Sequence, residues 1–594
     1  MAVLLMGNEA IARGAVEAGI RVATSYPGTP ASEIMATLIH FAAEAGIYAE
    51  WSVNEKVAVE IAAGAAYAGA RALVSMKQMG LNVAADAVMS LAYIGVKGGL
   101  VLVVADDPGP HSSQTEQDTR LFARFAKLPV LDPSCPREAY SMTKYAFTLS
   151  ETLGLPVILR PTTRVSHACQ EVEVDSIPPR PPVPGFTRDP RWVIMPSLAA
   201  RQHVWLNRQQ QRAREEFAAS PFNEIHLEGP VGVITSGASY FYVTEALKLL
   251  GLKLSRLKIG TPYPLPEEIV DRFLSRMERV LIVEEQEPVV EDQVIHLAWR
   301  RGLAVELAGK HDGHLPREGE FNVDKVAAAL TRFLKLEGEK PSPALPEPPP
   351  LPERPPLFCA GCPHRGSFYA FKQAAHGRNV IFSGDIGCYT LGAAPPLAAM
   401  DTCLCMGAGL GLAQGLARVQ PGTRLVAFIG DSTFFHAGLP PLVNAVHQQT
   451  PLVVVVLDNE TTAMTGHQPH PGLPSPAGRR AIDIARVARA CGVTTVLSAD
   501  PLDLEATMAV ARQALDTPGP ALVILRHPCP QIDRPATRYR IKAEDCSGCR
   551  TCIDELGCPA LTPTGDGGVT INAACTGCGL CARVCPAAAI EEVV

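Results

Sequence analysis

Residues 424–466 of this chain read RLVAFIGDSTFFHAGLPPLVNAVHQQTPLVVVVLDNETTAMTG. This stretch reads as an apolar strand ending at Gly430, then a helix, then a second all-apolar strand ending at Asp458. This order is a βαβ unit, whose two strands pair in parallel. Asp431 and Asn459 would then emerge at one carboxyl edge of the sheet, where open α/β sheets bind ligands.

The residues expected at that edge are suited to hold Mg2+ and a phosphate. Asp431 and Asn459 offer hard oxygen ligands, which Mg2+ takes alongside phosphate oxygens. Gly-Asp-Ser followed about thirty residues later by Asn is the signature of thiamine diphosphate enzymes, although Ser432 stands where the commoner form has glycine. This resemblance implies that Gly430 and Ser432 approach the diphosphate and that a backbone carbonyl near Thr461 is a third Mg2+ ligand. The alternative is an ordinary sheet in which Asp431 caps a helix and Asn459 starts a turn.

Thiamine enzymes need a second α/β domain to hold the aminopyrimidine ring, and the N-terminal region fits this role. EWSVNEKVAVEIAAGAAYAGA, residues 50–70, predicts an alanine-rich helix. In related enzymes a glutamate at the start of such a helix protonates the pyrimidine, which implies Glu55 rather than Glu60. The alternative is that Glu55 is a surface residue that pairs with Lys56 or interacts with the helix dipole. Thr29 stands where related enzymes contact the substrate carboxylate, although threonine also commonly starts helices.

The last tenth of the chain carries eight of its seventeen cysteines, in two runs. The second run has the C-x2-C-x2-C-x3-C-P spacing of bacterial two-cluster ferredoxins, in which the fourth ligand of each cluster comes from the opposite run. The first run is similar but has five residues rather than three before its last cysteine. Paired structural zinc sites are the alternative, but they usually show paired C-x2-C motifs. The expected [4Fe–4S] ligands are Cys546, Cys549, Cys552 and Cys585 for one cluster, and Cys575, Cys578, Cys581 and Cys558 for the other.

Composition argues against several classes of protein. The formal charge is −7, and no region concentrates the lysine and arginine that a grip on nucleic acid requires. The longest apolar runs, such as 452–457, are too short to span a bilayer, and the N-terminal stretch lacks the positive charges of a signal peptide. We therefore expect a cytoplasmic protein without a membrane segment. Thiols stay reduced in the cytoplasm, so clustered cysteines there bind metal rather than form disulfides.

With three further motifs, the chain resembles the α subunits of indolepyruvate ferredoxin oxidoreductases, a family of the 2-oxoacid:ferredoxin oxidoreductase superfamily. The motifs are GNEAIARGAVEAGIRVATSYPGTPASEI at 7–34, FCAGCPHRGSFYAFK at 358–372 and GDIGCYTLG at 384–392. The resemblance implies oxidative decarboxylation of aryl 2-oxoacids such as indolepyruvate with coenzyme A, giving aryl-acetyl-CoA, CO2 and reduced ferredoxin. The alternatives are a thiamine-dependent decarboxylase that releases no electrons, and an electron-relay subunit without thiamine chemistry.

The resemblance also implies site residues and partners. His467 and His470 follow the thiamine motif closely enough to touch substrate, with solvated loop histidines as the alternative. A metal at the C-x2-C pair is not expected, because no second pair lies nearby in the sequence. The family further implies a smaller β subunit carrying a γ-type domain, an α2β2 assembly and an external ferredoxin. The residues expected to line or bind the cofactor are Cys359, Cys362, His364, Gly384 and Asp385.

The expected fold class is α/β: a multi-domain thiamine diphosphate-binding fold of doubly wound parallel sheets, with a C-terminal α+β domain of two-[4Fe–4S] ferredoxin type. A proline-rich stretch marks one domain boundary. The expected parts are a pyrimidine-binding domain over 1–175, a connector over 176–228, a transketolase C-terminal-like domain over 229–340, a proline-rich linker over 341–356, a diphosphate- and Mg2+-binding domain over 357–540, and the ferredoxin domain over 541–594.

Overall fold

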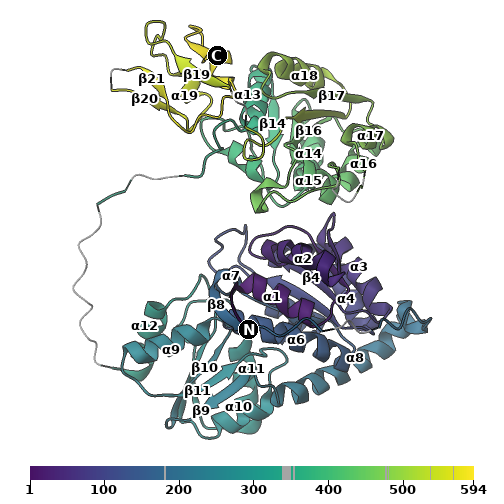
Figure 1. Cartoon of the computed structure of the whole chain (residues 1–594), viewed down its shortest axis with the longest axis vertical. Coiled ribbons are helices and arrows are strands. Elements are labelled where there is room, and N and C mark those ends of the chain that lie inside the picture. The colour runs from purple at the N-terminus through teal and green to yellow at the C-terminus, as the bar shows by residue number, and fades with distance from the viewer. Residues whose placement is uncertain are drawn as a thin grey trace. The chain divides into compact units, whose positions relative to one another are not determined.

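The structure is a computed structural model, and it divides into two compact units (Figure 1). The first unit is Met1–Pro348 and the second is Pro349–Val594. Most of the predicted proline-rich linker falls outside the described residues. The structure describes residues 1–178, 182–336, 349–351, 355–474, 478, 480–534, 537–565 and 567–593.

The first unit begins with a six-stranded parallel sheet in the order β3-β2-β4-β5-β7-β6. Its central strands β4 and β5 are apolar and almost wholly buried, as expected for a parallel sheet covered by helices on both faces. This confirms the predicted doubly wound α/β fold. The strands are β2 Val22–Ser25, β3 Tyr48–Trp51, β4 Ala72–Lys77, β5 Leu100–Ala105, β6 Val130–Leu131 and β7 Val157–Leu159.

Seven helices accompany this sheet. The predicted alanine-rich helix is α3, and it begins at Glu55 because the Asn54 side chain accepts a hydrogen bond from Val57 N–H at 2.9 Å, a standard N-cap. The short strands β1 Ala2–Met6 and β8 Cys169–Glu173 form a separate antiparallel pair. The helices are α1 Gly7–Glu17, α2 Ser32–Ala45, α3 Glu55–Tyr67, α4 Gln78–Ile94, α5 Thr119–Ala126, α6 Pro136–Leu153 and α7 Thr163–His167.

A five-stranded sheet in the order β13-β12-β10-β11-β9 follows in the same unit. The predicted connector contains the 3-10 turn η1 Pro190–Trp192, the long helix α8 Pro196–Ala218, and β9 Asn223–His226, which pairs antiparallel with β11. The other elements are β10 Val231–Ser236, β11 Ser255–Ile259, β12 Arg279–Val283, β13 Glu306–Ala308, α9 Ser239–Leu249, α10 Glu267–Leu274, α11 Val289–Arg301 and α12 Val323–Leu334.

Two buried arginines join the two sheets of the first unit. Arg120, at the start of α5, pairs with Asp118 at 2.6 Å and reaches across to Glu284, after β12, at 2.7 Å. Arg160 pairs with Asp106 at 2.7 Å, its NH1 lies 3.3 Å from a carboxylate oxygen of Asp132, and its NH2 donates across to Gln286 Oε1, after β12. All of these charged side chains are at most 2% exposed. Since each buried charge has a partner, removing one would leave another uncompensated.

The second unit is built on a five-stranded all-parallel sheet in the order β14-β15-β16-β18-β17 (Figure 1). As predicted, β15 ends at Gly430 and β16 at Asp458, and the strands pair in parallel with Gly430 opposite Leu457. The strands are β14 Val380–Ser383, β15 Arg424–Gly430, β16 Leu452–Asp458, β17 Thr495–Ala499 and β18 Ala521–Arg526.

The predicted helix between β15 and β16 was expected over about 439–448, but the helical stretch begins earlier. It starts directly at Asp431 and passes through a π-helical turn before α16. Pro440 and Pro441 follow this turn, and neither has an N–H with which to continue the regular hydrogen-bond ladder. The elements are α13 Pro363–Ala375, η2 Cys388–Ala393, α14 Ala408–Val419, α15 Asp431–Thr433, η3 Phe434–Gly438, α16 Leu439–His447, η4 Ala463–Thr465, α17 Ile484–Ala490 and α18 Leu504–Asp516.

The C-terminal segment is a small α+β domain, which confirms the prediction. Its two antiparallel strand pairs are β19 with β22 and β20 with β21. None of the helices in the described parts of the chain has both the length and the apolar composition needed to cross a lipid bilayer. The elements are β19 Arg538–Ile541, α19 Thr551–Asp554, β20 Leu561–Pro563, β21 Val569–Ile571, α20 Leu580–Arg583 and β22 Ile590–Val593.

The buried ion pairs predict a large stability effect of Arg120. Arg120→Ala should lower the free energy of unfolding of the first unit by about 3–5 kcal/mol, because it leaves the buried carboxylates of Asp118 and Glu284 without their cationic partner. Arg124 is a matched control on the same helix, since it pairs with Asp292 at 3.6 Å with both side chains exposed. Arg124→Ala should cost less than about 1 kcal/mol. All four tryptophans lie in the first unit, so their fluorescence during urea unfolding reports on it. Equal losses in the two variants would contradict the assignment.

Candidate functional site

Asp431 and Asn459 meet at the carboxyl edge of the second unit's sheet. The Asn459 backbone N–H donates to Asp431 Oδ2 at 3.1 Å, and the Ser432 N–H donates to Asp431 Oδ1 at 2.7 Å. Asp431, Asn459 and the nearby Thr461 are 3%, 7% and 3% exposed. The parallel pairing of β15 with β16 therefore places both side chains where the sequence predicted.

The oxygen atoms at this edge converge as cation ligands would. The end of the Asn459 carboxamide lies 2.9 Å from the Thr461 carbonyl oxygen and 3.3 Å from Asp431 Oδ2. With its NH2 group at this position the amide donates to both oxygens, and turned over beside a cation it would present its own oxygen next to them. In an octahedral Mg2+ shell, neighbouring oxygens are about 3 Å apart, since each lies about 2.1 Å from the metal. The three groups therefore fit the expected Mg2+ ligand set.

Two further acidic groups are buried around this edge. Asp458 Oδ2 accepts from Arg526 Nε at 2.6 Å, and burial together with the charge of Asp431 raises the pKa of Asp458. Asp385 Oδ1 accepts from the Gly407 N–H at 2.7 Å, and its Oδ2 accepts from the Tyr389 hydroxyl at 2.9 Å. Burial raises the pKa of Asp385 to about 6. These carboxyl groups favour a cation close by.

Two glycines of the predicted site lie where neighbouring side chains leave no room for a Cβ. A Cβ on Gly430 would lie 2.5 Å from the Tyr389 hydroxyl oxygen, and a Cβ on Gly384 would collide with the Met400 side chain. Both positions therefore lack room for a side chain. Gly384 and Asp385 thus support the edge on which Asp431 and Asn459 lie.

The two predicted histidines after the thiamine motif have different surroundings. His467 is exposed, with a φ of 63°, whereas His470 is buried with its Nε2 3.1 Å from Asp431 Oδ2. His364 is also buried, and its ring contacts that of Tyr389 edge to face at 5.6 Å. Burial lowers the pKa of His364 to about 4, against the opposing effect of the Asp431 charge. The structure thus places His364 and His470 near Asp431, and leaves His467 exposed.

Four thiols from separate segments are close enough to affect one another's ionisation, and one of them, Cys529, lies beside Asn459. Only two of the four were expected at the site from the sequence. Cys529 N–H donates to the Asn459 carbonyl at 3.1 Å, and Cys388 opens η2. Burial raises the pKa of Cys362 to about 12 and that of Cys388 to about 11, and charge on neighbouring thiols adds to both. Those neighbours are Cys359 and Cys388 for Cys362, and Cys529 and Cys359 for Cys388. The expectation of no metal here considered only pairs close in sequence, whereas Cys388 and Cys529 come from distant loops.

In the first unit, Glu55 and Glu60 differ sharply. Glu55 is 5% exposed, and its Oε1 lies 2.7 Å from where a Cβ on Gly80 would be. Lys56 pairs with Glu60 on the exposed face instead. Burial lowers the pKa of Lys77, although the charges of Asp107 and Glu55 oppose the shift. Glu55 is therefore not the surface residue of the alternative interpretation.

Thr29 is half-buried in the loop after β2. Its carbonyl oxygen accepts a hydrogen bond from the Ser112 hydroxyl at 3.3 Å. The Thr29 loop and Glu55 both belong to the first unit, whereas Asp431 and Asn459 belong to the second.

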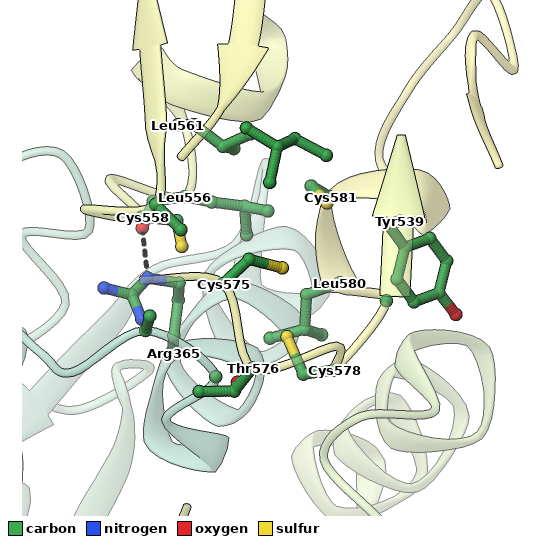
Figure 2. Close-up of a pocket in the computed structure, with 15 residues that line it drawn as sticks. Arg365, Tyr539, Leu556, Cys558, Leu561, Cys575, Thr576, Cys578, Leu580 and Cys581 are labelled. Carbon is green, nitrogen blue, oxygen red and sulfur yellow. Dashed lines mark hydrogen bonds between the residues drawn. The ribbon is translucent and has the colours of Figure 1, made fainter. Parts of the chain in front are cut away.

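The eight C-terminal cysteines line two cavities, in the two groups that the crossover pattern predicts. One cavity is shown in Figure 2, where sulfur atoms from both runs face a shared space. A thiol set of this number and type fits a [4Fe–4S] cluster. Cysteines of both groups also pack in a single apolar cluster, so the cavities are neighbours. The first cavity is lined by Cys558, Cys575, Cys578 and Cys581, and the second by Cys546, Cys549, Cys552 and Cys585.

The buried Arg365 ties the first cavity to the C-x2-C loop. Its Nε donates to the Leu556 carbonyl at 2.8 Å (Figure 2), and its NH1 donates to the Cys359 carbonyl at 2.9 Å. Ala360 and Gly361, between the two cysteines of that loop, line the same cavity. The loop holding Cys359 therefore borders this cavity.

Four family models match the chain. They are a pyruvate flavodoxin/ferredoxin oxidoreductase thiamine diphosphate-binding domain over 13–182, an indolepyruvate oxidoreductase domain over 226–343, a C-terminal thiamine pyrophosphate-binding domain over 385–525, and a 4Fe–4S binding domain over 569–591. They confirm thiamine diphosphate and iron–sulfur clusters as cofactors. The alternative of structural zinc sites is therefore not needed to explain the C-terminal cysteines.

Known proteins similar to this chain were also found. Indolepyruvate oxidoreductase subunit IorA of Methanothermobacter thermautotrophicus is 45% identical, with 99% of this chain and 97% of the relative covered. The subunit of the same name from Pyrococcus abyssi is 44% identical, with 100% and 97% covered. A solved 2-oxoglutarate:ferredoxin oxidoreductase from Magnetococcus marinus is similar at a TM-score of 0.45 and 17% identity, over 56% of this chain and 65% of that one. Because the curated relatives match along almost their whole length, this oxidoreductase chain belongs to the family of indolepyruvate oxidoreductase subunit IorA.

Proposed function

We propose that the chain oxidatively decarboxylates aryl 2-oxoacids, with indolepyruvate as substrate, coenzyme A as acyl acceptor and ferredoxin as electron acceptor. One observation carries the proposal: a sheet edge with three convergent oxygen ligands and two four-cysteine cavities belong to the same chain. A thiamine-dependent decarboxylase that releases no electrons would have no use for the cavities. A relay subunit without thiamine chemistry would have no use for the convergent oxygens.

The chain's own residues bind and orient the cofactor. When bound, thiamine diphosphate supplies the electron sink that the loss of CO2 from a 2-oxoacid requires. Asp431, Asn459 and the Thr461 carbonyl would hold the Mg2+ that binds its diphosphate, which their convergence at one sheet edge supports. Glu55 holds the proton on the pyrimidine nitrogen, which its burial supports. Thr29 contacts the substrate carboxylate.

Electrons leave through the cysteines. The four thiols that affect one another's ionisation are suited to a third cluster, because their number and type match a [4Fe–4S] ligand set and distant segments bring them together. The Cys359–Cys362 loop borders the cavity of Cys575. The cluster in that cavity therefore receives the electrons next, and the cluster in the cavity of Cys546 receives them last. The part of this last cluster site around Cys546 and Cys549 then faces an external ferredoxin.

The partners follow from the family. A smaller β subunit supplies the γ-type domain, and the assembly is α2β2, with thiamine diphosphate held between the pyrimidine domain of one α chain and the diphosphate domain of another. The reducing cytoplasm suits so many free thiols. Indolepyruvate rests on the similarity to the IorA relatives, so comparing indolepyruvate, phenylpyruvate and hydroxyphenylpyruvate with the αβ complex tests the choice.

The Mg2+ assignment predicts a selective loss. Asp431→Ala should abolish retention of thiamine diphosphate, because the metal loses its carboxylate ligand, while iron content stays unchanged. Thiamine and iron are measured on the same anaerobically purified sample. Asp516→Ala, which changes an exposed aspartate paired with Arg378, is the control and should retain both. Normal thiamine content in Asp431→Ala would contradict the assignment.

The third cluster predicts an iron count. Cys388→Ser should lower the iron content by about one third, since one of three clusters loses a ligand. Thiamine content should stay near normal, and dye reduction driven by 2-oxoacid and coenzyme A should fall steeply. Cys169→Ser, at an exposed cysteine of the first unit, should change none of these. Unchanged iron in Cys388→Ser, with two clusters per chain in the unmodified protein, would contradict the third cluster.

A further inference from the structure

His470 is a buried histidine whose outer ring nitrogen faces the thiamine diphosphate edge. Its side chain is 2% exposed, and its Nε2 lies 3.1 Å from Asp431 Oδ2. That nitrogen nonetheless completes no hydrogen bond with any residue that the structure describes. Since buried polar atoms are nearly always paired, the nitrogen calls for a partner that comes with a ligand.

The surroundings of the ring determine which nitrogen carries the proton. The Gly472 N–H donates to His470 Nδ1 at 3.1 Å, so Nδ1 is the acceptor and the neutral ring carries its proton on Nε2. The Phe435 ring stacks on it with a centroid distance of 6.2 Å and an interplanar angle of 28°. A Cβ on Gly472 would lie 2.8 Å from His470 Cε1, so glycine is required for this approach. Nε2–H is therefore a fixed donor and is unsuited to ligate a metal.

The nearby carboxylate oxygens already have donors. Asp431 Oδ1 and Oδ2 accept from the backbone N–H groups of Ser432 and Asn459. Asp458 Oδ2 accepts from Arg526 Nε, and its Oδ1 accepts from the Glu460 N–H at 3.3 Å. Asp431 is also the expected Mg2+ ligand, which engages it further. Each carboxylate oxygen could accept a second hydrogen bond, but His470 Nε2 makes none with Asp431 Oδ2 in this geometry. A phosphoryl oxygen that binds at this edge would give Nε2–H its acceptor.

We propose that His470 is a cofactor-binding residue that donates its Nε2–H to a phosphoryl oxygen of the diphosphate held at this edge. The inference rests on the proposed thiamine diphosphate site and adds a protein donor to the three Mg2+ ligands. A neutral N–H donor beside an anionic oxygen gives a charge-assisted hydrogen bond. It also gives the diphosphate one direct contact with the chain that does not pass through the metal.

The test compares His470→Phe with His470→Gln in the full chain together with its partner subunit. Phenylalanine keeps a ring and removes the donor, whereas the glutamine amide restores an N–H at similar reach. Isothermal titration calorimetry measures the Kd of thiamine diphosphate, and of inorganic diphosphate as a second probe, at saturating Mg2+. The Kd for both should rise by about 10- to 100-fold in His470→Phe and recover largely in His470→Gln. His447→Phe, at an exposed histidine at the end of α16, should match the unmodified chain.

The outcomes separate the inference from its premises. An unchanged Kd in His470→Phe at saturating Mg2+ would overturn it. A rise in Kd that vanishes as Mg2+ is increased would overturn it as well, because His470 would then act only by holding Asp431. If the unmodified complex bound neither probe in the presence of Mg2+, the thiamine diphosphate site itself would be wrong. Iron content, measured on every variant, shows that the ferredoxin domain remains folded.

Discussion

The parallel pairing of β15 with β16 is the constraint on which the rest of the site depends. Because Gly430 lies opposite Leu457, the next residues along each strand leave the sheet side by side. That register brings the carboxylate of Asp431, the amide of Asn459 and the carbonyl of Thr461 to a single point, although the first and last are 30 residues apart in the sequence. A slip of the register would separate the oxygens and dismantle the cation site.

The same edge concentrates negative charge in a buried place, which has an electrostatic consequence. Asp385, Asp431 and Asp458 are each no more than 4% exposed. Burial raises the pKa of Asp385 and Asp458, which means that these groups resist ionisation when no counter-ion is present. A bound divalent cation would reverse that preference, since it favours the ionised carboxylates. Hydrogen bonds and Arg526 compensate part of this burial, and a bound cation would compensate more of it.

Short-range patterns in the sequence were sufficient to predict the sheet edge and the grouping of the eight C-terminal cysteines. Two apolar runs located β15 and β16, and the ferredoxin spacing predicted which four cysteines line each cavity. Contacts between distant loops could not be read in this way. Cys388 and Cys529 join the C-x2-C loop only after folding, and His470 differs from His467 in burial, which their shared loop does not reveal. Burial likewise separates Glu55 from the exposed Glu60 on one helix, whereas the choice of Glu55 from the sequence depended on the family resemblance.

Carbon chemistry and electron transfer are joined within this one chain. The most direct measurement mixes the anaerobic αβ complex with indolepyruvate and coenzyme A in the absence of ferredoxin, and follows CO2 release together with the electron paramagnetic resonance of the clusters after rapid freezing. We expect reduced clusters to appear in step with CO2. Release of CO2 while the clusters remain oxidised would contradict it.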